Sequence, residues 1–338
     1  MLVGIIEDNS VDVSPDILET ARSLRELHYG KKIYLRGLIE FTNYCKNDCF
    51  YCGIRKGNRT IKRYRLSEEQ IIACCDRGYE LGFRTFVLQG GEDDYYNADY
   101  MCRIIGNIRN KFPDCAITLS FGEHSKQIYQ RYYNAGANRY LLRHESASSA
   151  HYKKLHPSDM KLENRKECLY NLKEIGFQVG AGFMVGSPYQ TFDDLAADLL
   201  FIKELEPHMV GIGPFIPAKS TPFKDFPAGT LNLTILMMAL TRILLPEVLL
   251  PSTTALSSIH PDGRELGLRA GGNVVMPNLS PAEIRGDYAI YDNKIFTGDE
   301  AAESKDYIIS RIKNAGFDVS MSRGDHVNIF QTGELRKS

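Results

Sequence analysis

Three cysteines lie close together in the segment "NYCKNDCFYCGIR", at Cys45, Cys49 and Cys52, with the spacing C-x3-C-x2-C. Thiolates are the usual ligands of iron–sulfur clusters, and a cubane cluster ordinarily takes four of them. Three ligands leave one iron free to bind another molecule, as an open position does in catalytic metal sites. The pattern therefore predicts a cluster that takes part in chemistry, with these three cysteines as its ligands.

A zinc knuckle is the alternative interpretation of the three cysteines. Structural zinc sites usually combine two C-x2-C or Cys/His pairs, and no second pair follows in this sequence. The spacing therefore favours the cluster. Five other thiols lack ligand spacing and are expected to pack as small apolar side chains: Cys74, Cys75, Cys102, Cys115 and Cys168.

Composition limits the classes of function. The chain has 338 residues, of which 43% are hydrophobic and 25% charged, and its net charge is −1, so neither nucleic acid nor a membrane surface is an expected partner. The apolar segment 235–245 is too short to span a bilayer and contains Arg242, so it is expected to be a buried helix. Eight cysteines without a secretory leader at residues 1–15 predict reduced thiols and a cytoplasmic location.

Short apolar segments alternate with amphipathic ones along most of the chain. The expected strands are 35–42, 84–89, 115–120, 139–143, 178–185, 209–212, 248–253 and 273–275. The expected helices between them are 67–82, 97–111, 124–135, 163–175, 191–205, 231–244 and 262–270. Ser67 and Gln70 form a capping box at the start of the first of these helices.

Eight such units predict an α/β fold of the (βα)8 TIM-barrel type, because helices must cover buried parallel strands. An open doubly wound sheet is the competing architecture, and the count of eight favours the closed barrel. We expect an N-terminal helical extension at 1–33, the barrel at 34–299, and a C-terminal appendage of one helix and one strand at 300–338. The appendage lies beyond the eighth unit, where it can close one end of the barrel.

Polar and glycine-rich residues follow the expected strands at the points where barrels carry their chemistry. The cysteines follow the first strand, "QGGED" (89–93) the second, "RHE" (143–145) the fourth, and Ser252 to Thr254 the seventh. Glycines let backbone groups approach a ligand closely, although a tight turn would also explain them. Arg143 and Glu145 can bind a carboxylate and a ribose hydroxyl or ammonium group, or they can form a structural ion pair.

Two further residues have both a functional and a simpler interpretation. Tyr51 precedes the last cysteine and can stack on an adenine ring or pack in the core. Arg165 can anchor a carboxylate, but its helical position alone favours a solvated side chain. The glycine-dense strand at 179–188 is not a dinucleotide fingerprint, because no helix begins at the required place.

Taken together, these motifs resemble the radical S-adenosylmethionine (SAM) family, and within it the HydE-type maturases of FeFe-hydrogenases. The resemblance extends from about residue 30 to 295 and includes "LIEFTNYCKNDCFYCGIRKGN", "VLQGGEDDYY", "RYLLRHES", "GAGFMVGSPYQT" and "MVGIGPFIPAKSTP". Biotin synthase and methylornithine synthase are looser relatives that share the barrel and the cysteine motif.

The resemblance implies one 4Fe–4S cluster that binds SAM and cleaves it reductively to methionine and a 5′-deoxyadenosyl radical. It implies an organometallic iron–cysteine substrate that carries CO and cyanide, other maturases as transient partners, and an electron donor such as ferredoxin or flavodoxin. The implied SAM contacts are Tyr51, Gly90, Gly91, Glu92, Asp93, Glu145, Arg165 and Tyr291. The implied substrate contacts are Thr118, Arg143, Thr253, Thr254, Met276 and Tyr288.

The sequence departs from the family pattern in two places. Residues 291–307, where some members carry cysteines for a second cluster, contain none, so we expect one cluster per chain. Gly90 stands where the family motif often has Ser, which removes a hydroxyl near the substrate. Two other functions remain open from the residues: a radical SAM mutase or lyase that acts on an amino acid, and a non-catalytic iron–sulfur scaffold.

Overall fold

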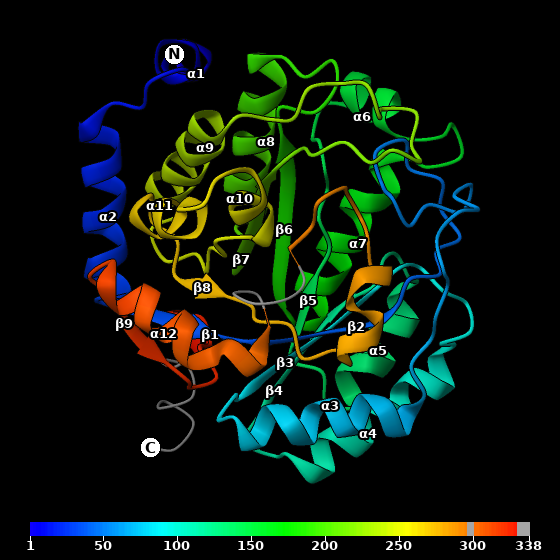
Figure 1. Ribbon diagram of the computed structural model, residues 1–338. Helices are drawn as coiled ribbons and strands as arrows, with labels where there is room; N and C mark the ends of the chain where they lie inside the picture. Colours follow the sequence, from blue (N-terminus) through cyan, green and yellow to red (C-terminus); the bar gives the residue numbers. More distant parts are fainter. Residues whose placement is uncertain (296–300, 330–338) are drawn as a thin grey trace.

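The computed structural model describes residues 1–295 and 301–329, and its centre is a parallel barrel (Figure 1). β1 (Lys32–Leu35) and β2 (Gly37–Thr42) are consecutive stretches of one strand interrupted at Arg36. β2 begins a six-stranded parallel sheet in the order β2-β3-β4-β5-β6-β7. The other strands of this sheet are β3 (Thr85–Gly90), β4 (Ala116–Ser120), β5 (Arg139–Leu141), β6 (Gln178–Val185) and β7 (Met209–Pro214).

Two further segments close the sheet into a barrel. Leu249 bridges Met209 of β7, and Pro251 bridges Val274 of β8 (Val274–Val275). β8 then pairs with β1 in parallel, which returns the sheet to its first strand. The predicted closed (βα)8 barrel is therefore confirmed, and the open sheet is excluded.

The expected strand at 248–253 is present only as isolated bridges. Pro251 lies in its middle, and proline has no N–H to donate to a ladder. The hydrogen bonds on either side of it are intact: Val210 N–H donates to Leu249 O over 3.0 Å, and Ser252 N–H donates to Val274 O over 2.9 Å.

Helices surround the barrel (Figure 1) and match the expected ranges to within two residues. They are α3 (Glu68–Glu80), α4 (Ala98–Lys111), α5 (Lys126–Asn134), α7 (Leu162–Ile175), α8 (Phe192–Leu205), α9 (Leu231–Leu244) and α11 (Gly263–Arg269). The capping box of Ser67 and Gln70 forms as predicted. The apolar segment 235–245 lies almost entirely in α9, whose residues are mostly buried. In the described part of the chain, no helix is both long and apolar enough to cross a membrane.

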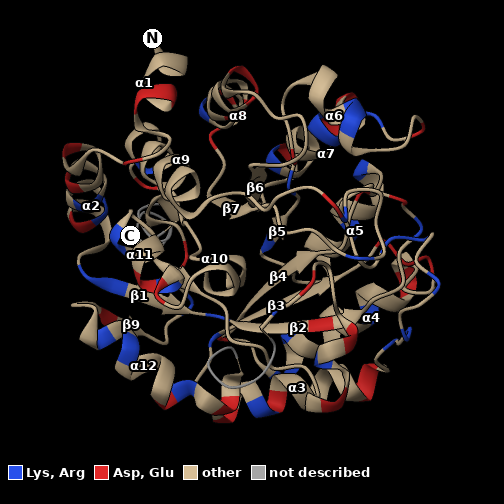
Figure 2. Cartoon of the chain, turned by 45° about the horizontal axis from the view of Figure 1, so that its top comes forward, with Lys and Arg blue, Asp and Glu red and all other residues tan. Residues whose placement is uncertain are grey.

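α1 (Leu2–Asn9) lies in the expected N-terminal helical extension, whereas the short helices α6 (Ser149–Leu155) and α10 (Thr254–Ile259) were not predicted. Helices of six to eight residues span about two turns, so they show little apolar periodicity. Figure 2 shows acidic and basic residues interspersed over the outer helices, whereas β3, β4, β6 and β7 contain neither.

The side chains of β6 point alternately into the hydrophobic core beneath the helices and into the interior of the barrel. Val179, Ala181, Phe183 and Val185 belong to the main hydrophobic core. Successive strand residues point to opposite faces, so Gly180 and Gly182 face the interior. On the neighbouring strand β7, a side-chain carbon at Gly211 would meet no atom closer than 3.9 Å. Gly211 therefore leaves room inside the barrel, whereas a side-chain carbon at Gly180 would lie 2.6 Å from Leu141 Cδ1 and one at Gly182 2.0 Å from Gly211 O, so these two glycines permit close packing.

The C-terminal segment lies at the amino-terminal end of the barrel strands, whereas the N-terminus lies on the other side of the molecule (Figure 1). α2 (Pro15–Tyr29) packs on α9, and after α12 (Lys305–Asn314) the strand β9 (Asp318–Ser320) pairs with β1. Asp325 then places a carboxylate oxygen 2.6 Å from Arg139 and 2.7 Å from Gln178, two buried residues at the starts of β5 and β6. The C-terminal segment therefore closes the amino-terminal end of the barrel, opposite the cysteines. The expected boundary at 299/300 lies outside the described residues.

Candidate functional site

The cysteine loop follows β2 and carries three half-buried thiols. Its backbone is fixed from several sides. Lys46 N–H donates to Glu92 O, and Gly53 N–H donates to Ile290 O, each over 2.8 Å. These bonds join the loop to the segment after β3 and to the segment after the short 3-10 helix Ala282–Asp287.

Arg63 holds this loop from within, and sequence reasoning missed it. Its guanidinium donates to the carbonyl oxygens of Asn43, Ile54, Arg55 and Asn58. A buried carbonyl without a donor is costly, and one planar guanidinium carries five donors in a fixed geometry. The basic residues of this segment look alike in sequence, so no local signal separates Arg63 from its exposed neighbours.

The electrostatics of the loop suit metal ligation. Burial raises the pKa of all three thiols, that of Cys52 to about 12, and the thiols of Cys52 and Cys45 raise the pKa of Cys49 further. Backbone N–H groups of Asn47 and Glu92 oppose the rise at Cys45. Among the described residues, no three Cys, His, Asp or Glu side chains are already arranged to hold a single metal ion. Thiols that raise one another's pKa require compensating positive charge when they ionise, which an iron–sulfur cluster supplies. The donor set therefore fits the predicted cluster.

The glycine turn after β3 lies directly against the cysteine loop. A side-chain carbon at Gly91 would lie 2.1 Å from Tyr44 O and 2.7 Å from Cys45 Cβ, so only glycine fits. At Gly90 the same atom would lie 2.8 Å from Thr42 Cγ2. The Asp93 carboxylate forms a two-point ion pair with Arg65 over 2.7 and 2.9 Å, which ties the turn to the base of the cysteine loop.

Arg165 is buried, contrary to the simpler expectation that it is solvated. It is 7% exposed, and its Nε lies 2.8 Å from Glu123 Oε1. Glu92 Oε1 lies 4.0 Å from Arg165 Nη2 and accepts the N–H of Glu123 over 3.1 Å. Although burial alone would lower it, Glu123 and Glu92 raise the pKa of Arg165 well above its usual value. A permanently charged guanidinium therefore faces the region of Cys49 and Tyr51, whose pKa values it lowers.

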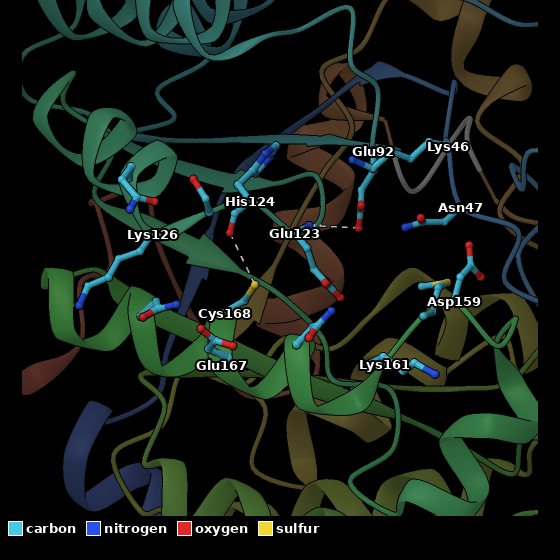
Figure 3. A pocket seen from close by; sticks show the side chains of 15 residues that line it. Lys46, Asn47, Glu92, Glu123, His124, Lys126, Asp159, Lys161, Glu167 and Cys168 are labelled. Carbon is cyan, nitrogen blue, oxygen red and sulfur yellow. Dashed lines mark hydrogen bonds between the residues drawn. The ribbon is translucent and has the colours of Figure 1, made fainter.

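A cavity of about 700 Å³ opens beside Glu92 and Glu123, the two carboxylates next to Arg165 (Figure 3). Glu92 and Glu123 line it from one side, and Lys46, Asp159 and Cys168 lie around it. Met160 also lines it, and its sulfur lies 3.8 Å from Cys49 Sγ. The cavity therefore connects solvent with the neighbourhood of the cysteine loop.

Polar groups without partners face the interior of the upper barrel. Arg143 Nη2 lies 3.1 Å from Glu145 Oε2, but the two are not aligned for a hydrogen bond. Among the described residues, the hydroxyls of Thr118 and Thr253 also have no hydrogen-bond partner. Buried polar groups are normally paired, so such a set marks a place for a polar ligand. Of the expected contacts, Thr118 is buried and Arg143, Glu145 and Thr253 are half-buried, and each has a buried polar atom without a hydrogen-bond partner.

The remaining expected contacts surround the same space. Tyr51 is half-buried and its hydroxyl lies 3.2 Å from His156 Nε2. Burial raises its pKa well above the usual range, and Cys49 and Glu145 add to this rise. The Tyr288 hydroxyl accepts from Gln89 Nε2 over 3.4 Å. Tyr291 follows Ile290, whose carbonyl contacts the cysteine loop.

Thr254 and Met276 complete the expected set. Thr254 is the first residue of α10, next to the half-buried Thr253. Met276 packs on an interior cluster that includes Tyr34, Met209 and Leu249. It therefore lies deeper in the barrel than the groups at the strand ends.

A buried ion pair between Glu40 and Lys294 was also missed. Glu40 is fully buried in β2, and its carboxylate binds Lys294 Nζ and accepts from Asn278 Nδ2 over 2.8 Å. A charged residue in the apolar strand "LRGLIEFT" was a signal that it had a partner. The partner follows 254 residues later and carries no signal of its own.

The fold and this site define a class of protein. A family model for the radical SAM superfamily matches residues 39–202, which extend from β2 to α8. The chain is a radical SAM enzyme, a class that works with a 4Fe–4S cluster and SAM. Within this class it belongs to the HydE family. It is 42% identical over 316 residues to the FeFe-hydrogenase maturase subunit HydE of Thermotoga maritima, covering 94% of this chain and 90% of that protein.

Other similar proteins share the barrel. The 3-methylornithine synthase of Methanosarcina acetivorans is 28% identical over 301 residues, covering 88% of this chain and 83% of that protein. The crystal structure of a methylornithine synthase, PylB, superposes with a TM-score of 0.83 at 24% identity and covers 94% of each chain. This structural likeness supports the fold, whereas the substrate has to be inferred from the residues of the site.

Proposed function

We propose that this chain is a hydrogenase maturase of the HydE type, which acts with other maturases in building the active site of an FeFe-hydrogenase. The observation that carries the proposal is the 42% identity to HydE over 94% of the chain. It is supported by a cysteine loop, a charged anchor and unpaired interior polar groups that all lie at one end of the barrel.

Cys45, Cys49 and Cys52 are proposed as the three cluster ligands. A 4Fe–4S cluster held by these cysteines would supply the electron for reductive cleavage of SAM to methionine and a 5′-deoxyadenosyl radical. Arg63 and the Gly90–Gly91 turn keep the loop in place, and the half-buried setting limits access of water to the thiols.

The groups around the loop are proposed to orient SAM. Arg165 binds the methionine carboxylate, for which its planar guanidinium is suited. The turn from Gly90 to Asp93 offers backbone oxygens to the ammonium group, and Glu145 accepts from the ammonium group or a ribose hydroxyl. Tyr51 and Tyr291 contribute aromatic surface beside the nucleoside. Glu123 occupies Arg165 now, so SAM binding requires the two to separate or to share the guanidinium.

The interior polar groups are proposed to hold the substrate, an organometallic iron–cysteine complex. Arg143 supplies the positive charge for a carboxylate or cyanide, and Thr118, Thr253 and Thr254 supply hydroxyls. Met276 and Tyr288 shape the wall of the site. The same proposal includes transient delivery of the substrate by another maturase and an electron donor such as ferredoxin or flavodoxin. It also includes a cytoplasmic location, which the eight free cysteines support.

An amino-acid mutase is the second candidate, because the 3-methylornithine synthases of two Methanosarcina species are 28% and 27% identical to the chain. Arg143 would serve the carboxylate of either substrate. The test is to measure 5′-deoxyadenosine release with the iron–cysteine complex and, separately, with lysine. Release that depends on the complex supports the maturase, whereas release that depends on lysine alone would replace it with the mutase.

A further inference from the structure

Glu145 has a backbone conformation that side chains rarely adopt. Its φ is +64°, in the left-handed region. Ser146 N–H donates to His144 O over 2.8 Å, which closes a three-residue turn around Glu145. Turns of this kind are rare and costly for a non-glycine residue, and they persist only where the surroundings enforce them.

His144 and Asp198 enforce this turn from outside the barrel wall. Both side chains are completely buried, and His144 Nε2 lies 3.2 Å from Asp198 Oδ1. His144 Nδ1 accepts the N–H of Gly182 in β6 over 3.4 Å. The same Asp198 Oδ1 also accepts the N–H of Ala147, two residues after Glu145. The pair therefore holds the chain on both sides of Glu145.

The pair faces away from the site, whereas Glu145 faces into it. The His144 ring packs edge-on against Phe201 of α8 at 4.8 Å, and Asp198 lies on the same helix. Glu145 and Arg143 lie on the other side, with Nη2 and Oε2 3.1 Å apart. The Glu145 carboxylate also raises the pKa values of Tyr51 and Cys52, behind the larger effect of burial. Glu145 and the buried pair therefore lie on opposite sides of the barrel wall.

We propose that His144 and Asp198 are positioning residues that fix the left-handed turn and so direct the Glu145 carboxylate toward bound SAM. The inference rests on the proposed contact between Glu145 and SAM. An imidazole and a carboxylate are expensive to bury, and apolar side chains would fill the space at lower cost. Backbone bonds to β6 also hold this turn, because Glu145 N–H donates to Gly182 O over 3.0 Å and Glu145 O accepts from Met184 N–H over 3.4 Å. Acceptors at His144 and Asp198 add the bonds to the Gly182 and Ala147 amides, which an apolar pair could not make.

The geometry predicts which substitutions matter at Asp198. Asp198→Leu removes the acceptor, so the turn relaxes and Glu145 turns away from SAM. Asp198→Asn keeps an oxygen at Oδ1, which makes both contacts, and changes only Oδ2, which has no hydrogen-bond partner among the described residues. Asp198→Asn is therefore expected to restore what Asp198→Leu loses.

The test is a double-mutant cycle on SAM affinity, measured by calorimetry with the cluster-loaded protein. Glu145→Gln and Asp198→Leu should each weaken SAM binding by about tenfold, as expected for loss of one charge-assisted hydrogen bond. The double variant should also lose about tenfold, because both changes remove the same contact. Asp198→Asn should bind SAM within about twofold of the unchanged protein, by the same argument.

His208→Gln is the matched control. His208 Nδ1 accepts the N–H of Val179 near the start of β6, before Gly182 and away from the carboxyl end of the strand, so this variant should leave SAM affinity unchanged. Losses that multiply to about a hundredfold in the double variant would overturn the inference, because independent sites add in free energy. If Asp198→Leu does not fold, His144→Phe replaces it in the cycle, since Phe fits beside Phe201 and lacks both polar contacts.

The outcomes separate the inference from the proposed function. No effect of Glu145→Gln would remove the SAM contact itself, and with it this inference. A normal effect of Glu145→Gln together with no effect of Asp198→Leu or His144→Phe would overturn the positioning role alone.

Discussion

Gly91 and Cys45 are packed so closely that a methyl group on Gly91 would lie 2.7 Å from Cys45 Cβ. The glycine turn and the cysteine loop therefore form one unit, and the shape of the first depends on the position of the second. Glycine is therefore required at position 91 by close packing against the cysteine loop, whether or not the turn also contacts a ligand.

Gly91→Ala should displace the cysteine loop and reduce the iron bound per chain after reconstitution by more than half. The clash includes the Tyr44 carbonyl at 2.1 Å, and backbone cannot yield as a flexible side chain can. The measurement is iron content and cluster absorbance. Gly106→Ala is the control, because a side chain there meets nothing within 4 Å, and it should retain the full cluster. Normal iron content in Gly91→Ala would show that the two loops are not coupled.

Arg63→Lys should leave the barrel folded but make the cluster more sensitive to chelators. Lysine keeps the charge but cannot reach four carbonyls from one planar group. We expect the rate of iron loss to a chelator to rise about tenfold, which corresponds in free energy to the loss of one or two buried hydrogen bonds. Arg59→Lys, an exposed change in the same loop, should have no effect. Equal rates in the two variants would contradict the role of Arg63.

Asp325→Asn should destabilise the protein by about 3 kcal/mol at pH 7, because it leaves Arg139 buried without its carboxylate. Burial opposes ionisation of Asp325, but Arg139 and Arg323 hold its pKa below the usual value. A depressed pKa stabilises the fold above the unfolded-state value of about 4, and this stability is lost as the pH falls through the folded value.

The difference in unfolding free energy between Asp325→Asn and the unchanged chain should therefore be full at pH 7 and shrink below about pH 4. Urea denaturation at both pH values measures it. A difference that stays constant across this range would show that the Asp325 carboxylate does not titrate with a depressed pKa.

One cluster per chain predicts about four irons after reconstitution, because no cysteine follows Cys168. Iron and sulfide analysis of the anaerobically reconstituted protein measures it. Values near six or eight would require a second cluster with ligands other than cysteine near the C-terminus.

Much of the barrel could be predicted, because the alternation of apolar and amphipathic segments and the polar residues that follow the strands are local properties of the sequence. The helix ends and the position of the cysteines followed from caps, periodicity and spacing. Burial of Arg165 could not be predicted, because a charged residue in the first turn of α7 looks solvated until Glu123 and Glu92 from other loops are brought to it.

Long-range pairs explain the other omissions. His144 and Asp198 are separated by 54 positions, and Arg139 and Asp325 by 186, so only the closed barrel brings each pair together. The turn at Glu145 has no glycine to announce it, since its conformation is imposed by the buried pair. Residues that position others are therefore harder to recognise than the residues they position.

The most direct test of the central claim is functional reconstitution. An apo-FeFe-hydrogenase is expressed anaerobically with the other two maturases, with and without this chain, and hydrogen evolution is measured. The account predicts activity only when the chain is present, and its loss in Cys49→Ala, a variant that should remain folded by circular dichroism. No hydrogen evolution with a chain whose cluster and SAM cleavage are intact would contradict the maturase assignment.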